Sequence, residues 1–345
     1  MKTWQRLKRN PTLWKQYFVR EQVIKAIRSF FDEKKFHEIE TPILIGNPPA
    51  ESYLDVFQTT LLDRTRKGTP AYLSTSPEVA LKKLMTAGIG NCYSITKSFR
   101  NTEMQSNTHN PEFTILEWYR VNTQYKTIMD DCETLLLSIN KTLGDGNILK
   151  YQGKSFDLSK KWERISVKDA FLRWADVDLL EFFEMEKAKK ICAKKGYTVA
   201  SKNTWEELYN QIYLNEIEPH LGVDTPTVIY EFPGSMAALA RKKPSDPRFA
   251  ERFEFYIAGL ELGDCYGELT NWKEQEMRFQ EELKELKRLG KTTYDYDNDF
   301  IHALKEGMPE SSGIAVGIDR LIMLFANVTN IADTMFFPIG DLFEK

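Results

Sequence analysis

The sequence predicts a mixed α+β fold in which a mainly antiparallel sheet is flanked by helices. A strand-like run at residues 92–99 is followed by a polar, turn-rich loop and then by residues 112–120, which alternate strictly between two faces. This pattern is typical of an antiparallel hairpin. The 345 residues are enough for one large core. We therefore expect a single domain over residues 1–345.

The charge of the chain is nearly balanced, with 47 Lys and Arg residues against 50 Asp and Glu residues. This balance, without a basic tail, argues against sequence-independent binding of nucleic acid. No apolar run approaches the ~20 residues that span a membrane. No apolar signal core follows the N-terminus. We therefore expect a protein without a membrane segment.

Cysteine and histidine spacing gives no sign of a zinc site. The four cysteines are far apart and form no C-x-x-C pair, which is typical of reduced, mostly buried thiols in the cytoplasm. The four histidines show neither H-x-x-H nor H-E-x-x-H spacing.

The first hundred residues contain a helix and several short strands. Residues 20–31 carry an apolar stripe at helical spacing, and a short strand at 36–40 ends at Thr41-Pro42, where proline removes a backbone donor. Residues 53–61 and 71–74 are further strand candidates. A helix then runs to Met85 from Ser76 as N-cap, Pro77 at the first helical position and Glu78 at the positive end of the helix dipole. From these residues alone, this segment is first of all a well-made helix start.

The middle third is rich in helices and carries few candidate functional residues. Helices are expected at 126–143, 166–175, 184–195 and 204–221, with a small hairpin at 151–158. Thr204 and Glu207 have the spacing of a capping box. We expect residues of roughly 160–225 to form an insertion or outer layer.

The alternating strand at 112–120 carries the first candidate binding residues. Phe113, Ile115, Glu117 and Tyr119 share one face, and Arg100 stands at the end of the preceding strand. A carboxylate beside a phenol suits an ammonium group, whereas an arginine suits a phosphate or a carboxylate. An amphipathic hairpin with a solvated charged face would explain the same alternation equally well.

A second candidate site lies in residues 249–268, which follow a predicted strand at 227–232. We expect residues 249–268 to form one long strand with Phe253, Phe255 and Ile257 on one face. Glu254, Glu261 and Glu268 are spread along the apolar run or lie just beyond it. Buried acids are costly without partners, and a hard cation bridging to phosphates would supply one. Alternatively, Glu254 lies on a wet face and Glu268 in a turn.

The last third contains a charged helix and a glycine turn. Residues 273–289 form a helix whose charges are expected to be solvated, with pairs such as Glu274 and Arg278. Residues 313–325 are a strand, a glycine turn and an apolar helix, and Gly317 allows a ligand to approach the backbone. Arg320 lies in the first helical turn, against the dipole preference, which favours a role with an anionic ligand.

These segments together resemble the catalytic domain of class II aminoacyl-tRNA synthetases, and the lysyl branch most closely. The three motifs of that family correspond to residues 30–42, 99–120 and 313–324. Intervening blocks also match, with TSPE at 75–78, HNPEFTILEWY at 109–119, and RFEFYIAGLEL with GEL within 252–269. The resemblance implies a class II catalytic core, homodimerisation through the first motif, and ATP with Mg²⁺ as cofactors.

Three features resemble the stand-alone paralogues that ligate lysine to elongation factor P. The first motif begins close to Met1, so we expect no N-terminal anticodon-binding barrel. The sequence EWY at 117–119 follows the paralogues. So does Ala315, where the synthetases have glycine; in the paralogues this alanine accompanies a preference for the β-amino isomer of lysine.

The resemblance implies a role for each matching residue. Arg100, Arg320 and Glu261 are the implied catalytic residues, and Glu254 and Glu261 the implied metal ligands. The residues implied in binding ATP are Arg100, Asn101, Thr102, Glu103, His109, Asn110, Phe113, Glu261, Leu262, Gly317 and Arg320. Those implied in binding the amino acid are Ser76, Pro77, Glu78, Glu117, Tyr119, Glu268 and Ala315.

The sequence departs from the family pattern at three places. Thr102 stands where the motif usually has glutamate, and Glu103 is expected to take over its contact with the adenine amino group. The loop from Arg100 to His109 is one residue longer and lacks the arginine that relatives carry before the histidine. Asp264 stands where the family often has asparagine.

The resemblance thus implies a cytoplasmic ATP-dependent ligase that activates lysine or β-lysine as an adenylate. The acceptor would be a lysine side chain of elongation factor P, and binding of tRNA is not expected. Two alternatives remain: a truncated synthetase-like enzyme that charges tRNA or another acceptor, and a catalytically silent paralogue. The presence of Arg100, Glu261 and Arg320 together argues against the silent paralogue.

Overall fold

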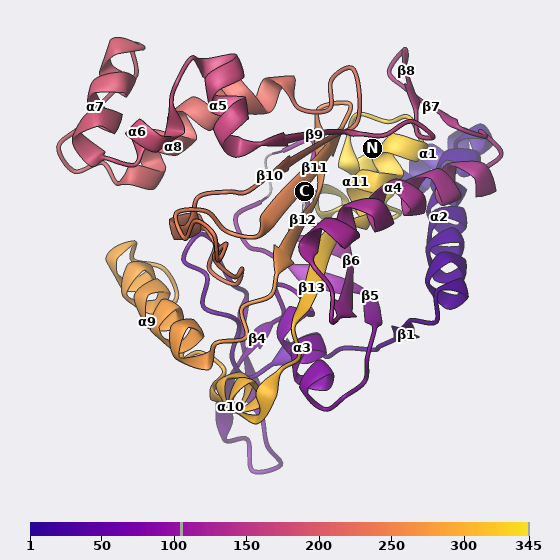
Figure 1. Cartoon of the computed structure of the whole chain (residues 1–345). Coiled ribbons are helices and arrows are strands. Elements are labelled where there is room, and N and C mark those ends of the chain that lie inside the picture. Colours follow the sequence, from indigo (N-terminus) through magenta and orange to yellow (C-terminus); the bar gives the residue numbers. More distant parts are fainter. Residues whose placement is uncertain (104–105, 344–345) are drawn as a thin grey trace.

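An eight-stranded sheet forms the centre of the molecule (Figure 1). The computed structural model describes residues 1–103 and 106–343. The strand order is β1-β5-β6-β13-β12-β11-β10-β9, and the pairs are antiparallel except at the two ends, where β1 pairs with β5 and β9 with β10 in parallel. The strands are β1 (His37–Glu38), β5 (Cys92–Phe99), β6 (Glu112–Val121), β9 (Glu163–Ser166), β10 (Thr227–Tyr230), β11 (Arg252–Ile257), β12 (Leu260–Gly267) and β13 (Ser311–Gly317). The predicted α+β fold with a mainly antiparallel sheet is confirmed.

Two smaller sheets lie beside the main one. The three-stranded sheet has the order β2-β4-β3, and a separate hairpin pairs β7 with β8. Their strands are β2 (Leu44–Ile45), β3 (Gln58–Leu62), β4 (Gly68–Leu73), β7 (Ile148–Tyr151) and β8 (Lys154–Asp157). The strand predicted from residue 53 begins later, at Gln58. Before it, the Leu54 amide donates to the Glu51 carbonyl oxygen and closes a turn.

The main core lies where three helices contact the sheet. They are α2 (Trp14–Glu33), α4 (Tyr125–Thr142) and α11 (Ile318–Phe325), shown together at the right of Figure 1. The predicted stripe on α2 is confirmed, because Val23, Ile27 and Phe31 are fully buried. They pack in one cluster with Leu116 and Trp118 of β6. Burial of these apolar side chains is the main force that fixes β6 in the sheet.

A second core belongs to the helix-rich segment beside β9 and β10, at the upper left of Figure 1. Its helices are α5 (Val167–Ala175), α6 (Leu179–Phe182), α7 (Met185–Lys194) and α8 (Trp205–Ile212). The capping box of Thr204 and Glu207 at the start of α8 is confirmed. The predicted helix 204–221 ends as an α-helix at Ile212. A π turn at Tyr213–Ile217 and a 3₁₀ turn at Glu218–His220 continue the chain, and Pro219 lies in the 3₁₀ turn.

The remaining helices are α1 (Thr3–Arg9), α3 (Glu78–Thr86), α9 (Trp272–Arg288), α10 (Asn298–Gly307) and α12 (Ile339–Phe343). The Glu274–Arg278 ion pair predicted on α9 is present at 2.6 Å. The expectation that the charges of α9 are solvated is wrong for Arg278. This side chain is buried and donates to the main-chain oxygens of Ala237, Ala238 and Ala240.

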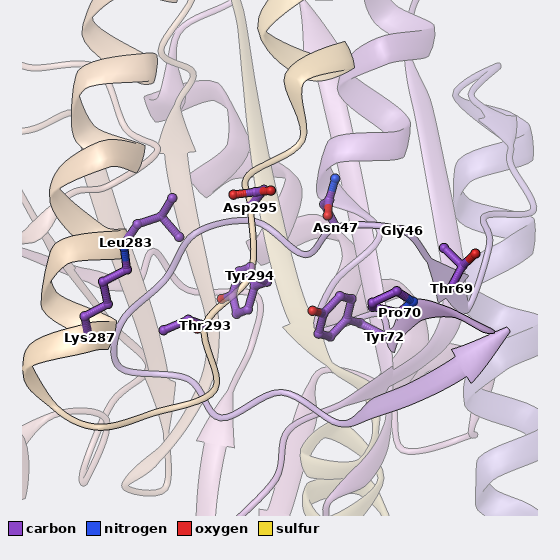
Figure 2. A pocket seen from close by; sticks show the side chains of 10 residues that line it. All are labelled: Gly46, Asn47, Thr69, Pro70, Tyr72, Leu283, Lys287, Thr293, Tyr294 and Asp295. Carbon is purple, nitrogen blue, oxygen red and sulfur yellow. The ribbon is translucent and has the colours of Figure 1, made fainter. Parts of the chain in front are cut away.

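An open cavity of about 580 Å³ lies between the three-stranded sheet and α9 (Figure 2). Tyr72 and Tyr294 form part of its wall, their ring centroids 5.5 Å apart, and Lys287 lines it from α9. None of the predicted site residues lines this cavity.

The segment predicted as one long strand at 249–268 is instead a hairpin. β11 and β12 are joined by Ala258 and Gly259, which have φ angles of 56° and 74°. Two positive φ angles in a two-residue loop are typical of a tight turn that matches the twist of antiparallel strands. The usual sequence for this turn is Asn-Gly or Asp-Gly, so the sequence Ala-Gly did not indicate a turn. As a result, Glu254 lies on β11 opposite Asp264, and Glu261 lies on β12 opposite Tyr256.

The turn makes a prediction about stability. Replacement of Gly259 by Val puts a β-branched side chain at a positive φ and is expected to cost roughly 1–2 kcal/mol. Thermal unfolding followed by circular dichroism would measure it as a lower midpoint. Ala258→Gly is the matched control, because it relieves the same backbone conformation and should leave the midpoint unchanged or raise it. Equal destabilisation by both variants would contradict this description of the turn.

Candidate active site

The predicted binding face lies in the middle of the main sheet. In the register of β5, β6, β13 and β12, Ser94, Glu117, Ala315 and Asp264 stand opposite one another across four neighbouring strands. Residues opposite one another in antiparallel strands point to the same face. Glu117 is 2% exposed and Tyr119 is 3% exposed. A solvated charged face is therefore excluded for these two residues.

The carboxylate of Glu117 is held by two hydroxyl groups. Ser76 Oγ donates to Glu117 Oε1 at 2.7 Å, and Tyr119 OH donates to Oε2 at 2.9 Å. Ser76 Oγ also accepts from the Glu78 amide at 3.0 Å, although α3 begins one residue later than predicted, with Pro77 as the N-cap. The start of α3 therefore positions a hydroxyl group at the strand of Glu117.

A lysine that the sequence analysis missed lies beside these residues. Lys82 of α3 is 1% exposed; its ammonium contacts the Glu78 carboxylate and lies 2.5 Å from Glu268 Oε2. Its signal was present in the sequence, since Lys82 follows Glu78 by one helical turn on an otherwise apolar helix. Gly313 makes the close packing possible, because a Cβ there would lie 2.2 Å from the Tyr119 ring and 2.7 Å from Glu268 Oε1.

Burial shifts the pKa values of these carboxyl groups upward. Burial, and then the charge of Glu78, raises the pKa of Glu117 to about 8. Burial also raises the pKa of Glu268 to about 7, although the Lys82 ammonium acts in the opposite direction. Burial alone would lower the pKa of Lys82, but the carboxylates of Glu268 and Glu78 raise it above its ordinary value. The ammonium of Lys82 is therefore charged throughout the physiological pH range.

Glu51 is a further buried carboxyl group that the sequence analysis missed. Tyr53 OH donates to its Oε1 at 2.8 Å, and burial followed by the charge of Glu78 raises its pKa to about 7. Local spacing gave no signal for it, because its charged neighbours Glu78 and Arg100 are distant in sequence.

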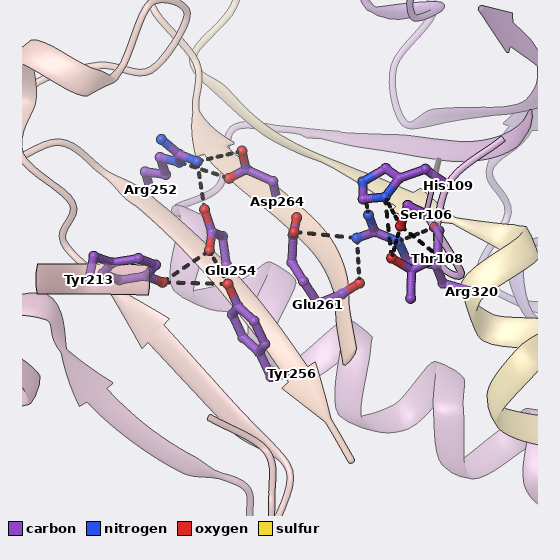
Figure 3. A network of polar contacts seen from close by, with 10 residues as sticks. All are labelled: Ser106, Thr108, His109, Tyr213, Arg252, Glu254, Tyr256, Glu261, Asp264 and Arg320. Atoms are coloured by element: carbon purple, nitrogen blue, oxygen red, sulfur yellow. Dashed lines mark hydrogen bonds and ion pairs between the residues drawn. The ribbon is translucent and has the colours of Figure 1, made fainter. Parts of the chain in front are cut away.

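The second cluster joins α11, β12 and the loop before β6 (Figure 3). Arg320 Nη1 donates to the carbonyl oxygen of Glu261 at 2.9 Å and contacts its Oε2 at 3.3 Å. Arg320 Nη2 donates to His109 Nε2 at 2.8 Å, and its Nε donates to the Thr108 carbonyl oxygen. Burial, and then the Arg320 charge, lowers the pKa of His109, which favours the neutral ring that accepts this hydrogen bond. The structure thus brings together Arg320, Glu261 and His109.

Arg100 lies at the same end of the sheet, over the ring of Phe113 at 5.2 Å. Its Nε is buried without a hydrogen-bond partner among the described residues. Glu103 is half-buried, and burial raises its pKa although the charges of Arg100 and Arg320 act in the opposite direction. Glu103 therefore lies within reach of the charges of Arg100 and Arg320, and its contact with the adenine amino group stays a prediction. Residues 104–105 of the longer loop lie outside the described part of the chain.

Several residues predicted to bind ATP have side chains that point elsewhere or are already engaged. Asn110 donates to the Glu112 carbonyl oxygen and accepts from the Ile339 amide. Thr102, at a positive φ of 66°, places its hydroxyl group 3.2 Å from Asp55 Oδ2. Asn101 Oδ1 accepts from the amide of Thr102, and the side chain of Leu262 packs in the main core. Gly317 has open space beside it, since a Cβ there would meet only the Arg320 side chain, at 3.9 Å.

Of the two predicted metal ligands, Glu254 has more hydrogen-bond partners within the protein than Glu261. Its Oε1 accepts from Arg252 at 2.6 Å, and its Oε2 accepts from the hydroxyl groups of Tyr256 at 2.7 Å and Tyr213 at 3.3 Å (Figure 3). Both of its oxygens are therefore engaged within the protein, and burial raises the pKa of Glu254 to about 8. Asp264, at the position where the family often has asparagine, also pairs with Arg252, at 3.0 Å. No group of three or more His, Cys, Asp or Glu side chains that could hold a metal ion occurs among the described residues.

Comparison with known proteins identifies the family of this chain. Residues 2–340 match the family described as tRNA synthetases class II (D, K and N). The chain belongs to this family. It is 36% identical over 322 residues to the elongation factor P–(R)-β-lysine ligase of Hamiltonella defensa, a match that covers 93% of this chain and 94% of that protein. The corresponding ligase of Proteus mirabilis is 35% identical, with 92% and 93% covered.

Lysine–tRNA ligases are similar to this class II chain over a smaller share of their length. The enzyme of Chloroflexus aurantiacus is 33% identical over 322 residues, which cover 92% of this chain and 64% of that protein. The chain thus spans about two thirds of these relatives and nearly the whole length of the elongation factor P ligases.

The buried carboxyl groups predict how stability depends on pH. Glu117, with a pKa of about 8, keeps its proton in the folded protein between about pH 5 and pH 8, where the unfolded chain, with a pKa of ~4.3, has lost it. The free energy of unfolding therefore falls as pH rises through this window. Glu254, Glu268 and Glu51 act in the same direction.

The thermal unfolding midpoint should fall from pH 6 to pH 9 in wild type, and it should fall less in Glu117→Gln. Glu112→Gln, at the exposed end of the same strand, is the control and should keep the wild-type slope. An equal slope in the Glu117→Gln variant would contradict the raised pKa.

Proposed function

We propose that this protein is an ATP-dependent ligase that activates lysine or β-lysine as an adenylate and transfers it to a lysine side chain of elongation factor P. The single observation that carries the substrate class is the buried carboxyl group of Glu117, which accepts from two hydroxyl groups and forms no ion pair among the described residues. Such a carboxylate favours an ammonium group. The names of the relatives that match over nearly their whole length support elongation factor P as the acceptor.

The residues at the other end of the sheet fit ATP. The Nε of Arg100 is a buried donor without a partner, and a phosphate or carboxylate oxygen would satisfy it. Phe113 offers a ring face at the same point. Glu261 fits Mg²⁺ better than Glu254 does, because its carboxylate is 38% exposed and has one ion-pair partner. Bound Mg²⁺ would neutralise charge on the phosphates, which would supply the remaining ligands.

The proposed chemistry depends on positioning and on neutralisation of charge. Arg100 holds the α-phosphate and the amino-acid carboxylate close together, so that a carboxylate oxygen meets the phosphorus in line. Arg320 leaves its contacts with His109 and Glu261 to bind phosphate oxygens, and neutralises charge that develops as pyrophosphate departs. In the second step, the lysine amine of the acceptor forms an amide bond with the acyl carbon, and the bond to AMP breaks.

We further propose a cytoplasmic homodimer in which the whole chain forms one catalytic domain. Dimerisation is supported by exposed apolar side chains near the first motif and on β2 and β3, at Ile43, Leu44, Leu61 and Leu62. The cytoplasm is supported by four cysteines that are free and buried. Among the described helices, none is both long and apolar enough to cross a membrane. The balanced charge of the chain supports a protein acceptor rather than tRNA.

The acceptor is tested by incubating the protein with ATP, a lysine isomer and elongation factor P, followed by mass spectrometry of the intact factor. We expect a gain of one lysyl mass on one lysine side chain. Arg100→Lys keeps the charge but loses the planar guanidinium group that can form two parallel hydrogen bonds. The rate of modification should therefore fall on the order of 10²-fold. Arg288→Lys, an exposed arginine of α9, is the matched control. No gain of mass with either isomer would refute the acceptor.

A further inference from the structure

Three carboxyl groups and one ammonium group are buried together where α3 packs against the main sheet. Glu78, Glu117 and Glu268 are 8%, 2% and 1% exposed, and Lys82 is 1% exposed. Burial of charges without partners is very costly, so the number of positive and negative groups in such a site is a strong constraint. One ammonium group can neutralise only one of the three carboxyl groups, so each of the other two either holds a proton or faces an ammonium group of a ligand.

The contacts show which carboxylates Lys82 neutralises. Its ammonium bridges Glu78, one turn earlier on α3, and Glu268, which directly follows β12. Glu117, on β6, has contacts from the hydroxyl groups of Ser76 and Tyr119 instead. Lys82 thus connects α3 to the end of β12. It forms ion pairs with Glu78 and Glu268 but none with Glu117.

We propose that Lys82 is a positioning residue that permanently balances one of the three carboxylates, so that the pocket accepts a substrate with two ammonium groups. The inference rests on the proposed function and deepens it, because it gives the reason for a diamino acid. One ammonium of the substrate meets Glu117 and Tyr119, and the other meets the Glu78 and Glu268 side. Lys82 does not touch the reacting atoms; it acts through Glu78 and Glu268.

The alternative role for Lys82 is that of a structural brace between α3 and β12. A brace would affect stability and leave the pH dependence of substrate binding unchanged. The two roles therefore differ in a property that can be measured. Other charged groups near the pocket are Glu51, whose carboxyl senses both Glu78 and Arg100, and the phenol of Tyr119.

The main test compares Lys82→Met with wild type in ATP–pyrophosphate exchange driven by each lysine isomer. We expect the KM for the lysine isomer to rise on the order of tenfold or more, with a smaller effect on kcat, because the buried carboxylates lose their internal cation. Without the Lys82 charge, Glu268 keeps its proton to higher pH. The KM of the variant should therefore decrease as pH rises, and its plot of KM against pH should lie at higher pH than that of wild type. Lys82→Arg keeps the charge and should restore the wild-type profile.

Lys83→Met is the matched control on the same helix. Lys83 also has two acidic partners, Asp297 at 2.7 Å and Asp299 at 2.8 Å, but it is partly exposed on the other side of α3. This variant should lose stability without a change in KM or in pH profile. If Lys82→Met keeps the wild-type KM and profile, Lys82 is a brace and the proposal is overturned.

A wild-type measurement keeps the proposal testable if Lys82→Met does not fold. Norleucine has the shape of lysine with one ammonium group, so it should bind better as pH falls and the pocket gains a proton. Lysine isomers should bind better as pH rises. Identical pH dependences for the two, measured by calorimetry, would overturn the two-charge pocket. If calorimetry shows binding of a lysine isomer but exchange is absent, the proposed function fails and the charge count is still tested.

Discussion

The burial of the Glu117 carboxyl group in the middle of the main sheet is the constraint on which the site depends. Both oxygens of a buried carboxyl group need hydrogen-bond partners, and the start of α3 and the end of β6 supply them through Ser76 and Tyr119. The same helix brings Lys82 to Glu268 one turn later. The position of α3 therefore determines both the hydrogen bonds of Glu117 and the charge balance of its neighbours.

The strand order explains why residues far apart in sequence meet at this point. β6 pairs with β13, and β13 with β12, so residues near 117, 315 and 264 lie side by side although nearly two hundred positions separate the first two. The turn after β13 starts α11 and places Arg320 against the Glu261 carbonyl oxygen of β12. The sheet thus carries a cluster of buried acidic side chains at the Glu117 end and two arginines, Arg100 and Arg320, beyond it. This division suits a substrate with ammonium groups at one end and a phosphate-bearing partner at the other.

Period-2 alternation was enough to predict the hairpin of β5 and β6 and which side chains share a face, but the burial of Glu117 and Tyr119 emerged only from the structure. It failed at Ala258-Gly259, where the side chains read as a continuous strand and only the backbone conformation reveals a turn. Contacts set by tertiary packing were also beyond reach. Arg252, Tyr256 and Tyr213 surround Glu254, and nothing in local spacing showed that Tyr213 of the helical segment reaches it. Lys82 could have been found, since its spacing from Glu78 was visible, but the burial that gives it significance was not.

The most direct measurement is ATP–pyrophosphate exchange with each amino acid in turn, including both lysine isomers. The two carboxyl groups that Lys82 does not neutralise can ionise when they face ammonium groups, so exchange should be stimulated by a lysine isomer and not by neutral amino acids of similar size. Stimulation by a neutral amino acid, or by none at all, would contradict the acidic pocket as the basis of substrate choice.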